Sequence, residues 1–389
     1  MKLRHQLAAY SPVTPTSIVR ALLASAGMGG DAAVALRARL VSRYAADDCV
    51  LCGSGTQALQ HAIATALTHK KRDGFIALPA FNCYDMASAA LGAGVRVALY
   101  DVNPLTLAPD LASFERVLAS GASAAVVAYL YGVPFEWEAV AGLARRFGVP
   151  LIEDAAQGHG ASWRDTPLGA LGRLSIVSFG RGKGWTGGNG GALLLRDIPL
   201  SLVAAPETGN GNARTTLGLA AQWLLGRPAL YGAPRAMPGL ALGETVYHSP
   251  SAVSSMPIAS AAAALATEEA STSEADCRRA NARRLSVELA GGNAERILVP
   301  SGAEPGYIRF PLLRHGGMQS LPARASALGI SASYPTTLAQ LPSLQASLVS
   351  VEEGFPGAER LVRELVTLPV HSRVSDVELS EIAEMVRKA

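Results

Sequence analysis

The stretch from Leu174 to Leu195, LSIVSFGRGKGWTGGNGGALLL, constrains the fold of this chain more than any other. An apolar run leads into it, a second apolar run closes it, and the loop between them holds six glycines. The runs predict two buried strands, and glycines let a backbone adopt positive φ and approach a ligand closely. The loop contains one lysine, Lys183, which is either a solvated surface residue, as most loop lysines are, or the reactive group of a site.

Two phosphate-binding motifs do not fit this loop. A Walker A loop needs GxxxxGK followed by Ser or Thr, but Val177 stands five residues before Gly182 and Gly184 follows the lysine. A dinucleotide-binding GxGxxG fails because Trp185 occupies the position of the third glycine. A lysine in a desolvated pocket can instead form a Schiff base with a carbonyl, including that of pyridoxal phosphate (PLP). That chemistry requires a carboxylate for the pyridinium nitrogen, a phosphate cradle and a face for the ring.

The composition excludes several function classes. The chain has 389 residues, enough for two or three domains, and its 49% hydrophobic and 17% charged residues predict a large core and buried interfaces. A net charge of +3 without a basic stripe argues against nucleic acid. We find no signal peptide and no charge-free apolar stretch of the roughly 18 residues that a membrane span needs. We therefore expect a cytoplasmic protein with no nucleic-acid or membrane partner.

The four cysteines also fit a reducing cytoplasm. Cys49 and Cys52 form a CxxC, but no second pair and no histidine spacing completes a zinc site. We therefore predict no metal.

Seven short apolar runs alternate with helical segments along the first half of the chain. This alternation is typical of an α/β fold with a mostly parallel seven-stranded sheet between helices. The predicted strands are 49–52, 75–78, 95–100, 124–131, 149–152, 175–179 and 192–195.

The chain is predicted to divide into two domains. The large domain, residues 1–250, begins with a helical segment at 1–47 and ends in an irregular arm at 198–250 that is apolar and rich in Gly and Pro. The arm lies either against a partner subunit or on a membrane surface, and its small basic face favours the subunit. Residues 251–389 form a smaller α+β domain, with a long helix at 258–289 and further helices at 321–328 and 375–387.

Ligands of such sheets bind outside the carboxyl ends of the strands. Ser54, Phe81, Asp154 and Ser178 each follow a predicted strand, so we expect them at one edge of the sheet. The GSGT turn at 53–56 opens a helix whose free N–H groups and dipole suit an anion, although Ser54 or Thr56 is also suited to ordinary capping.

The segment EDAAQGHGA carries a second pair of candidates, Asp154 and Gln157. An ionised carboxylate beside a pyridine nitrogen keeps that nitrogen protonated, so that the ring accepts electrons. Gln157 could hydrogen-bond the phenolic oxygen of the same cofactor. The alternative for Asp154 is to cap the following helix.

These motifs, in order, resemble the DegT/DnrJ/EryC1/StrS aminotransferases, which are fold type I PLP enzymes that aminate keto groups on nucleotide-linked sugars and cyclitols. The resemblance rests on SGTQAL, LPAFNCYDMASAALGAGVRVALYDV, VAYLYGVP, GVPLIEDAAQGHGA and SFGRGKGWTGGNGGALLL, within residues 50–197. It resumes at SSMPIASAAAALATEE, GISASYPTTL and FPGAERLVRELVTLPVHSRVSDVELSEI. It implies a homodimer with active sites at the interface.

The resemblance assigns roles to individual residues. Lys183 matches the Schiff-base lysine, Asp154 the pyridinium partner and Gln157 the residue near the ring oxygen. Gly55, Thr56 and Ser178 match the phosphate cradle, and the predicted cofactor-binding residues also include Ser54 and Cys83.

Three positions depart from the family pattern. Cys83 stands where an aromatic residue usually stacks on PLP, Val253 where an asparagine reaches the partner subunit's phosphate, and Tyr129 where a histidine is common. These changes leave the expected PLP chemistry intact, but they make a nucleotide-linked sugar a less secure prediction for the amino acceptor.

The predicted function is that of a PLP-dependent aminotransferase. Through a Lys183 Schiff base it would move an amino group from glutamate or glutamine to a keto sugar, nucleotide-linked in the best-known reactions of the family, or to a related polyol. The alternatives are other PLP chemistry, as in a dehydratase or lyase, and a catalytically silent protein of the same fold.

Overall fold

The computed structural model describes residues 4–68, 74–235 and 245–388. Its centre is a seven-stranded sheet with the strand order β1-β9-β8-β5-β4-β2-β3. Strands β3, β2, β4, β5 and β8 run parallel, whereas β9 is antiparallel to both of its neighbours, β8 and β1. The predicted fold class, an α/β protein with a mostly parallel sheet, is confirmed. The strands are β1 (Asp48–Cys52), β2 (Phe75–Pro79), β3 (Arg96–Tyr100), β4 (Ala124–Ala128), β5 (Leu151–Asp154), β8 (Leu174–Ser178) and β9 (Gly191–Leu195).

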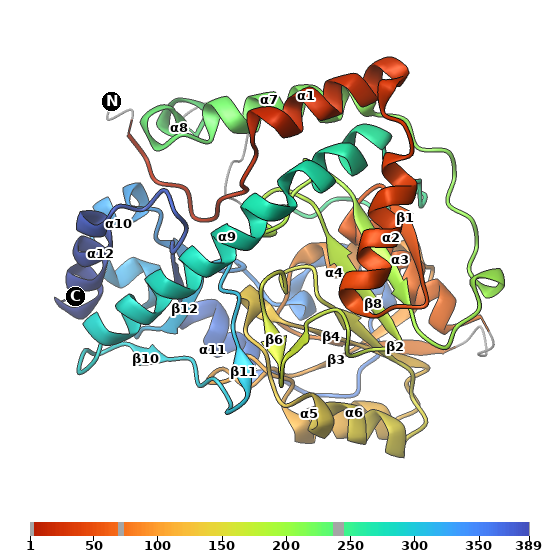
Figure 1. Cartoon of the computed structure of the whole chain (residues 1–389). Coiled ribbons are helices and arrows are strands. Elements are labelled where there is room, and N and C mark those ends of the chain that lie inside the picture. Colours follow the sequence, from red (N-terminus) through yellow and green to blue (C-terminus); the bar gives the residue numbers. More distant parts are fainter. Residues whose placement is uncertain (1–3, 69–73, 236–244, 389) are drawn as a thin grey trace.

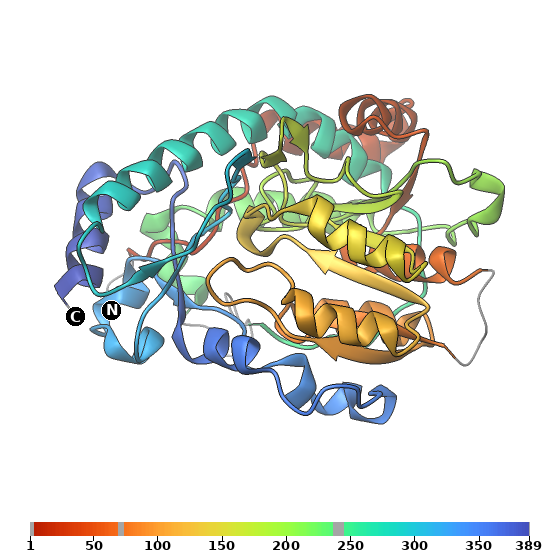
Figure 2. The ribbon, with the colours of Figure 1, turned by 90° about the horizontal axis from the view of Figure 1, so that it is seen from below.

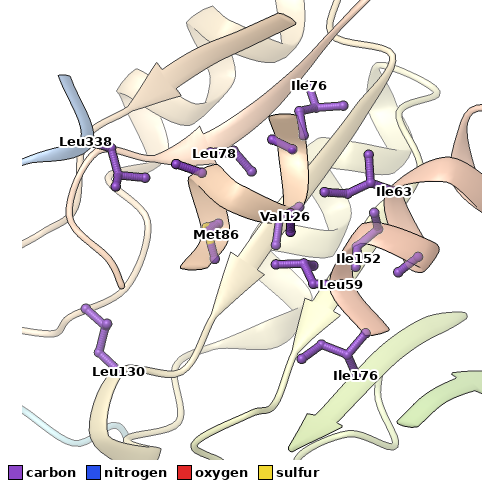
Figure 3. Close-up of a cluster of buried hydrophobic side chains, with 14 of the residues drawn as sticks. Leu59, Ile63, Ile76, Leu78, Met86, Val126, Leu130, Ile152, Ile176 and Leu338 are labelled. Atoms are coloured by element: carbon purple, nitrogen blue, oxygen red, sulfur yellow. The ribbon is translucent and has the colours of Figure 1, made fainter. Parts of the chain in front are cut away.

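Helices cover both faces of this sheet, which is why its strands are continuously apolar. The first face packs against α3 (Gly55–Ala66) and α4 (Tyr84–Gly92), as in the cluster of Figure 3. The second face packs against other helices and the first half of α9. Alternate strand residues therefore enter two separate cores, with Ile76 on the first face and Ala77 on the second. The helices of the second face are α2 (Ala32–Tyr44), α5 (Leu111–Ala119), α6 (Trp137–Arg146) and α9 (Ile258–Glu288).

The two faces also separate the cysteines of the CxxC. Cys49 packs in the second core and Cys52 in the first, because residues three apart on a strand point in opposite directions. Burial raises the pKa of the Cys52 thiol to about 12. Neither thiol is positioned to share a metal ion with the other.

The predicted strand 124–131 is three residues too long. Strand β4 ends at Ala128, and Leu130–Gly132 forms a tight turn in which Tyr131 has φ 58°. A positive φ is strained for a residue with a side chain, and here backbone pairs with Gly306 and Ile308 hold the turn. The strand prediction missed this turn because it depends on contacts from the other end of the chain.

The second half of the chain builds a smaller antiparallel sheet, of order β10-β12-β14-β13. Helix α9 runs from the large sheet to this one, with Ala261 in a core of the former and Leu285 in the core of the latter (Figures 1 and 2). The domain boundary at 250/251 stays a prediction. The elements are β10 (Glu295–Arg296), β12 (Phe310–Leu313), β13 (Ser331–Ala332), β14 (Leu365–Leu368), α10 (Arg324–Ala327), α11 (Pro356–Glu364) and α12 (Asp376–Lys388).

The predicted helix 321–328 shrinks to the single turn of α10, because Pro322 disfavours helical backbone at Leu321, which is extended at φ −98° and ψ 149°. A three-stranded sheet of very short strands, in the order β11-β6-β7, was not predicted. Its strands are β6 (Ser162–Trp163), β7 (Thr166–Pro167) and β11 (Ala303–Glu304).

The arm at 198–250 is largely helical where it is described. Together with the N-terminal helices it forms a layer above α9 (Figure 1). Part of the predicted arm, residues 236–244, lies outside the described residues. No helix in the described part of the chain has the length and apolarity to cross a bilayer. The elements of the layer are α1 (Pro15–Leu23), the π-helical turn η1 (Ala24–Met28), α7 (Asn212–Leu225) and α8 (Pro228–Arg235).

A buried carboxylate organises the connection between β5 and β8. Glu153 is fully buried and accepts hydrogen bonds from the backbone N–H groups of Gly169, Leu171 and Gly172 at 2.7, 3.0 and 2.8 Å. The hydroxyl of Ser175 donates a fourth hydrogen bond at 2.7 Å. Hydrogen bonds to an ionised acceptor are about twice as strong as neutral ones. One side chain thus fixes a whole loop.

We predict that Glu153→Ala lowers the free energy of unfolding by about 3 kcal/mol or more, because it leaves buried donors without an acceptor. Glu153→Gln should cost less, since one oxygen still accepts. The midpoint of urea unfolding measures both effects, and Glu353→Ala at an exposed site is the control. A loss for Glu153→Ala no larger than that of the control would contradict the role of this carboxylate.

Candidate active site

A cavity of about 230 Å³ lies at the carboxyl ends of the central strands. Its wall contains every residue that was predicted to be catalytic or to bind the cofactor. Those residues are Ser54, Gly55, Thr56, Cys83, Asp154, Gln157, Ser178 and Lys183. The strand-end argument therefore brings together side chains that are up to 129 positions apart in the sequence.

The start of α3 forms one wall of the cavity. Ser54 caps this helix, because its Oγ accepts the N–H of Gln57 at 3.1 Å, so the capping alternative holds for Ser54. A Cβ built on Gly55 would lie 2.7 Å from both Cβ and Oγ of Ser178, which only glycine avoids. The start of the helix lines the cavity together with the hydroxyls of Thr56 and Ser178. The first turn carries no acidic residue, so no negative side chain of the helix competes with a bound anion for its free N–H groups. The arrangement suits an anion such as phosphate.

The Gly-rich loop forms the opposite wall and carries Lys183, which is half-buried in the cavity rather than exposed on the surface. Gly182 and Gly184 on either side of it have φ 76° and 87°, values that favour glycine. The backbone N–H of Gly182 donates to Ser11 Oγ at 2.6 Å, which ties the loop to the N-terminal segment. Lys183 forms no ion pair with a carboxylate among the residues described.

Asp154 ends β5 with its carboxylate at the cavity, where Oδ1 accepts the N–H of Ala156 at 2.9 Å. Burial raises the pKa of this carboxyl, while the Ala156 N–H and the Lys183 ammonium act in the opposite direction. An additional positive charge beside Asp154 would therefore stabilise its ionised form.

Gln157 is held by hydrogen bonds at both ends of its amide. Its Oε1 accepts the backbone N–H of Tyr131 at 2.8 Å, and its Nε2 donates to Tyr334 Oη at 3.1 Å. The second hydrogen of Nε2 is left for a ligand. Tyr334 comes from the C-terminal half of the chain, so both halves position this amide.

Cys83 precedes α4, and its Sγ donates to Asp85 Oδ2 at 3.6 Å. Burial, together with the Asp85 carboxylate, raises the pKa of this thiol to about 11, so it is neutral at pH 7. Phe81, which was expected at the same edge, does not reach the cavity: it is fully buried, with its ring 5.2 Å from that of Tyr334. Val253 packs beside the core of its own chain, and its carbonyl accepts the N–H of Glu207.

The sequence argument missed several residues of the cavity wall. Arg181 and Asn189 flank Lys183 in the same loop, and their polarity amid glycines was an available signal. Asp85 lies within α4, where nothing in the sequence distinguishes it from a solvated helix residue. Within the described residues, no group of three His, Cys, Asp or Glu side chains could hold a metal ion.

Comparisons with known proteins agree with this geometry. The family model described as "DegT/DnrJ/EryC1/StrS aminotransferase family" matches residues 17–204. The chain is 33% identical over 167 residues to an L-glutamine:2-deoxy-scyllo-inosose aminotransferase of Micromonospora echinospora, which covers 43% of this chain and 39% of that protein. It is 35% identical over 156 residues to an L-glutamine:scyllo-inosose aminotransferase of Streptomyces griseus, covering 40% and 36%. The match thus spans less than two fifths of each relative.

Solved structures resemble the whole chain. The sugar aminotransferase CalS13 from Micromonospora echinospora superposes with a TM-score of 0.76 at 21% identity over 100% of both chains. The putative sugar aminotransferase Spr1654 from Streptococcus pneumoniae, in its PMP form, gives 0.75 at 16% identity over 97% of both chains. Residues 17–204 of this chain therefore resemble the DegT/DnrJ/EryC1/StrS aminotransferase family, and the fold of the chain is that of solved sugar aminotransferases.

Proposed function

We propose that the protein is a PLP-dependent aminotransferase that transfers an amino group from glutamine or glutamate to a keto polyol or keto sugar. The observation that carries this proposal is the meeting of Lys183, Asp154 and the α3 anion site in one cavity. The names of the relatives, glutamine:inosose aminotransferases, supply the donor and acceptor classes. The proposal includes a homodimer with active sites at its interface and a cytoplasmic location.

The residues present fit the cofactor. The crossing of Gly55 and Ser178 leaves no room for a Cβ, so backbone N–H groups can approach a phosphate closely. Thr56 and Ser178 would bind that phosphate, and Asp154 would hold the proton on the pyridine nitrogen. When bound, PLP supplies an aldehyde carbon and an electron-accepting ring.

Lys183 performs the proton transfers in this proposal. It is the one lysine among the described residues of the cavity wall. Its Nζ would accept the proton from the α-carbon of the amino donor and later deliver a proton to the acceptor carbon. The neutral Cys83 thiol offers a small apolar surface nearby, and Gln157 offers one N–H to a ligand oxygen.

We predict that PLP gives wild-type protein a visible absorption band and, after borohydride reduction, a pyridoxyl label on Lys183. Lys183→Ala should lose the label and lower turnover by at least about 10³-fold, since an acid–base group contributes about 10²–10⁴-fold. Glutamine or glutamate should convert unreduced cofactor to its amine form. A label on another lysine would refute the assignment, while a correct label without conversion would favour other PLP chemistry or a silent protein.

We predict that Gly55→Ala lowers PLP affinity at least about tenfold, because its Cβ would push Ser178 out of the phosphate cradle. The matched control is Gly142→Ala in α6, where a new Cβ would meet only Arg145 Nη2 at 3.9 Å. This variant should bind PLP normally. Equilibrium titration of the absorption band measures both affinities, and equal values would place the phosphate elsewhere.

We predict that Asp154→Asn makes the cofactor-free protein more stable at neutral pH. Because the folded-state pKa of Asp154 is raised, the folded protein binds its proton more tightly than the unfolded chain does. The stability of the wild type therefore falls as the pH rises from the pKa of the unfolded chain to the higher pKa of the folded protein, and the asparagine variant avoids this loss. Thermal unfolding should show a gain for the variant that grows as the pH rises and vanishes below the ordinary Asp pKa of about 3.9.

With PLP added, wild type should be more stable than Asp154→Asn, because its carboxylate gains a positive partner with which asparagine cannot form an ion pair. A cofactor-free variant that is less stable than wild type, by an amount that grows with pH, would contradict the direction of the pKa shift.

A further inference from the structure

The helices α1, η1, α7 and α8, residues 15–28 and 212–235, form an outer layer on one side of the molecule (Figure 1). Helices α1 and α7 pack on each other and on α9, and α8 packs on α7. Below the layer lies the Gly-rich loop, where a Cβ on Gly188 would meet the side chain of Leu219 at 2.8 Å. The layer is therefore a well-packed part of the fold, and its inner side is covered by contacts with α9 and the Gly-rich loop.

The outer layer carries apolar side chains on both of its sides. On the inner side Ala21 and Leu219 are buried, and the hydroxyls of Ser25 and Thr216 are joined at 2.9 Å. Other large aliphatic residues face out: Leu217 is 71% exposed and Leu22 57% exposed. These exposed side chains form an apolar patch on helices that pack on one another, and large patches of this kind mark interaction sites. Its members are Val19, Leu22, Met28, Leu217, Leu224, Leu225 and Leu230.

The two chain segments that form this patch carry no acidic side chain. Residues 4–30 and 208–235 contain no Asp or Glu, although the chain as a whole has 31 acidic residues. Arg20, Arg214 and Arg227 are exposed, and none of them pairs with a carboxylate in the part of the chain that is described.

The end of α7 adds an amphipathic pair to the patch. The guanidinium of Arg227 lies 4.2 Å from the ring centre of Trp223. Tryptophan and arginine are the residues that suit the boundary between headgroups and acyl chains.

We propose that the outer layer docks peripherally on a lipid bilayer with anionic headgroups. Leucines surrounded by unpaired arginines match such a surface in both apolarity and charge. A second copy of the chain matches it less well, because a two-fold contact would place one acid-free cationic face against another. This inference revises the sequence-based expectation of no membrane partner and does not depend on the proposed chemistry.

The strength of the docking follows from the same residues. Each arginine near an anionic surface contributes roughly fivefold to partitioning, and this contribution weakens as salt screens the charges. A few exposed leucines give reversible rather than permanent attachment. The expected behaviour is salt-sensitive binding that requires both kinds of residue.

The test is sedimentation of the full-length protein with vesicles of phosphatidylcholine, with or without phosphatidylglycerol. Wild type should bind only the vesicles with phosphatidylglycerol, and high salt should release it. Leu217→Glu should lower binding at least about tenfold, and Arg214→Gln combined with Arg227→Gln about 25-fold. The matched control is Val287→Glu near the far end of α9, where the valine is 76% exposed, and it should bind as wild type does.

Light scattering on the same variants distinguishes a lipid bilayer from a second copy of the chain as the partner of the outer layer. If wild type ignores anionic vesicles and Leu217→Glu yields a smaller assembly, a second copy covers the layer and the proposal is wrong. Equal vesicle binding by wild type and Leu217→Glu would also overturn it. Because Leu217 and the two arginines are exposed, their variants should unfold at the wild-type temperature, and circular dichroism checks this.

Discussion

The buried carboxylate of Glu153 is the interaction on which the site depends. It lies in the middle of the sheet, accepts four hydrogen bonds and so fixes the path from β5 to β8. Its neighbour Asp154 points the other way, as alternation along a strand requires, and reaches the cavity. Arg196 adds the opposite charge, donating to the carbonyls of Gly169 and Gly172 in the same loop. Glu153 thus stabilises the loop, and the carboxylate of Asp154 is available to a ligand.

The sheet was predictable from sequence because burial on both faces demands continuously apolar strands, and seven such runs became seven strands. The sequence analysis missed the features that depend on contacts with residues distant in the sequence. The tight turn at Tyr131 is held by backbone pairs with residues 306 and 308, and the two-residue strand β11 pairs with β6, which lies far from it in the sequence. Periodicity carries no information about such contacts, since neither partner is locally distinctive.

The site was predictable to the extent that strand ends define it. Asp154 and Ser178 directly end parallel strands, so topology alone brings them together. Phe81 shows the limit of that argument: it follows a strand by two residues, and its ring turns into the core against Tyr334. Tyr334 itself, which holds Gln157, arrives from the C-terminal half and could not be placed without the fold.

The Gly-rich loop links the cavity to the outer layer. Ser11, just before α1, accepts the N–H of Gly182, and Leu219 of α7 fills the space that Gly188 leaves open. The close approach explains why the inner side of α7 has room for few large residues and why its other leucines lie outside. The Gly-rich loop that carries Lys183 therefore also determines how closely α7 packs on the rest of the fold.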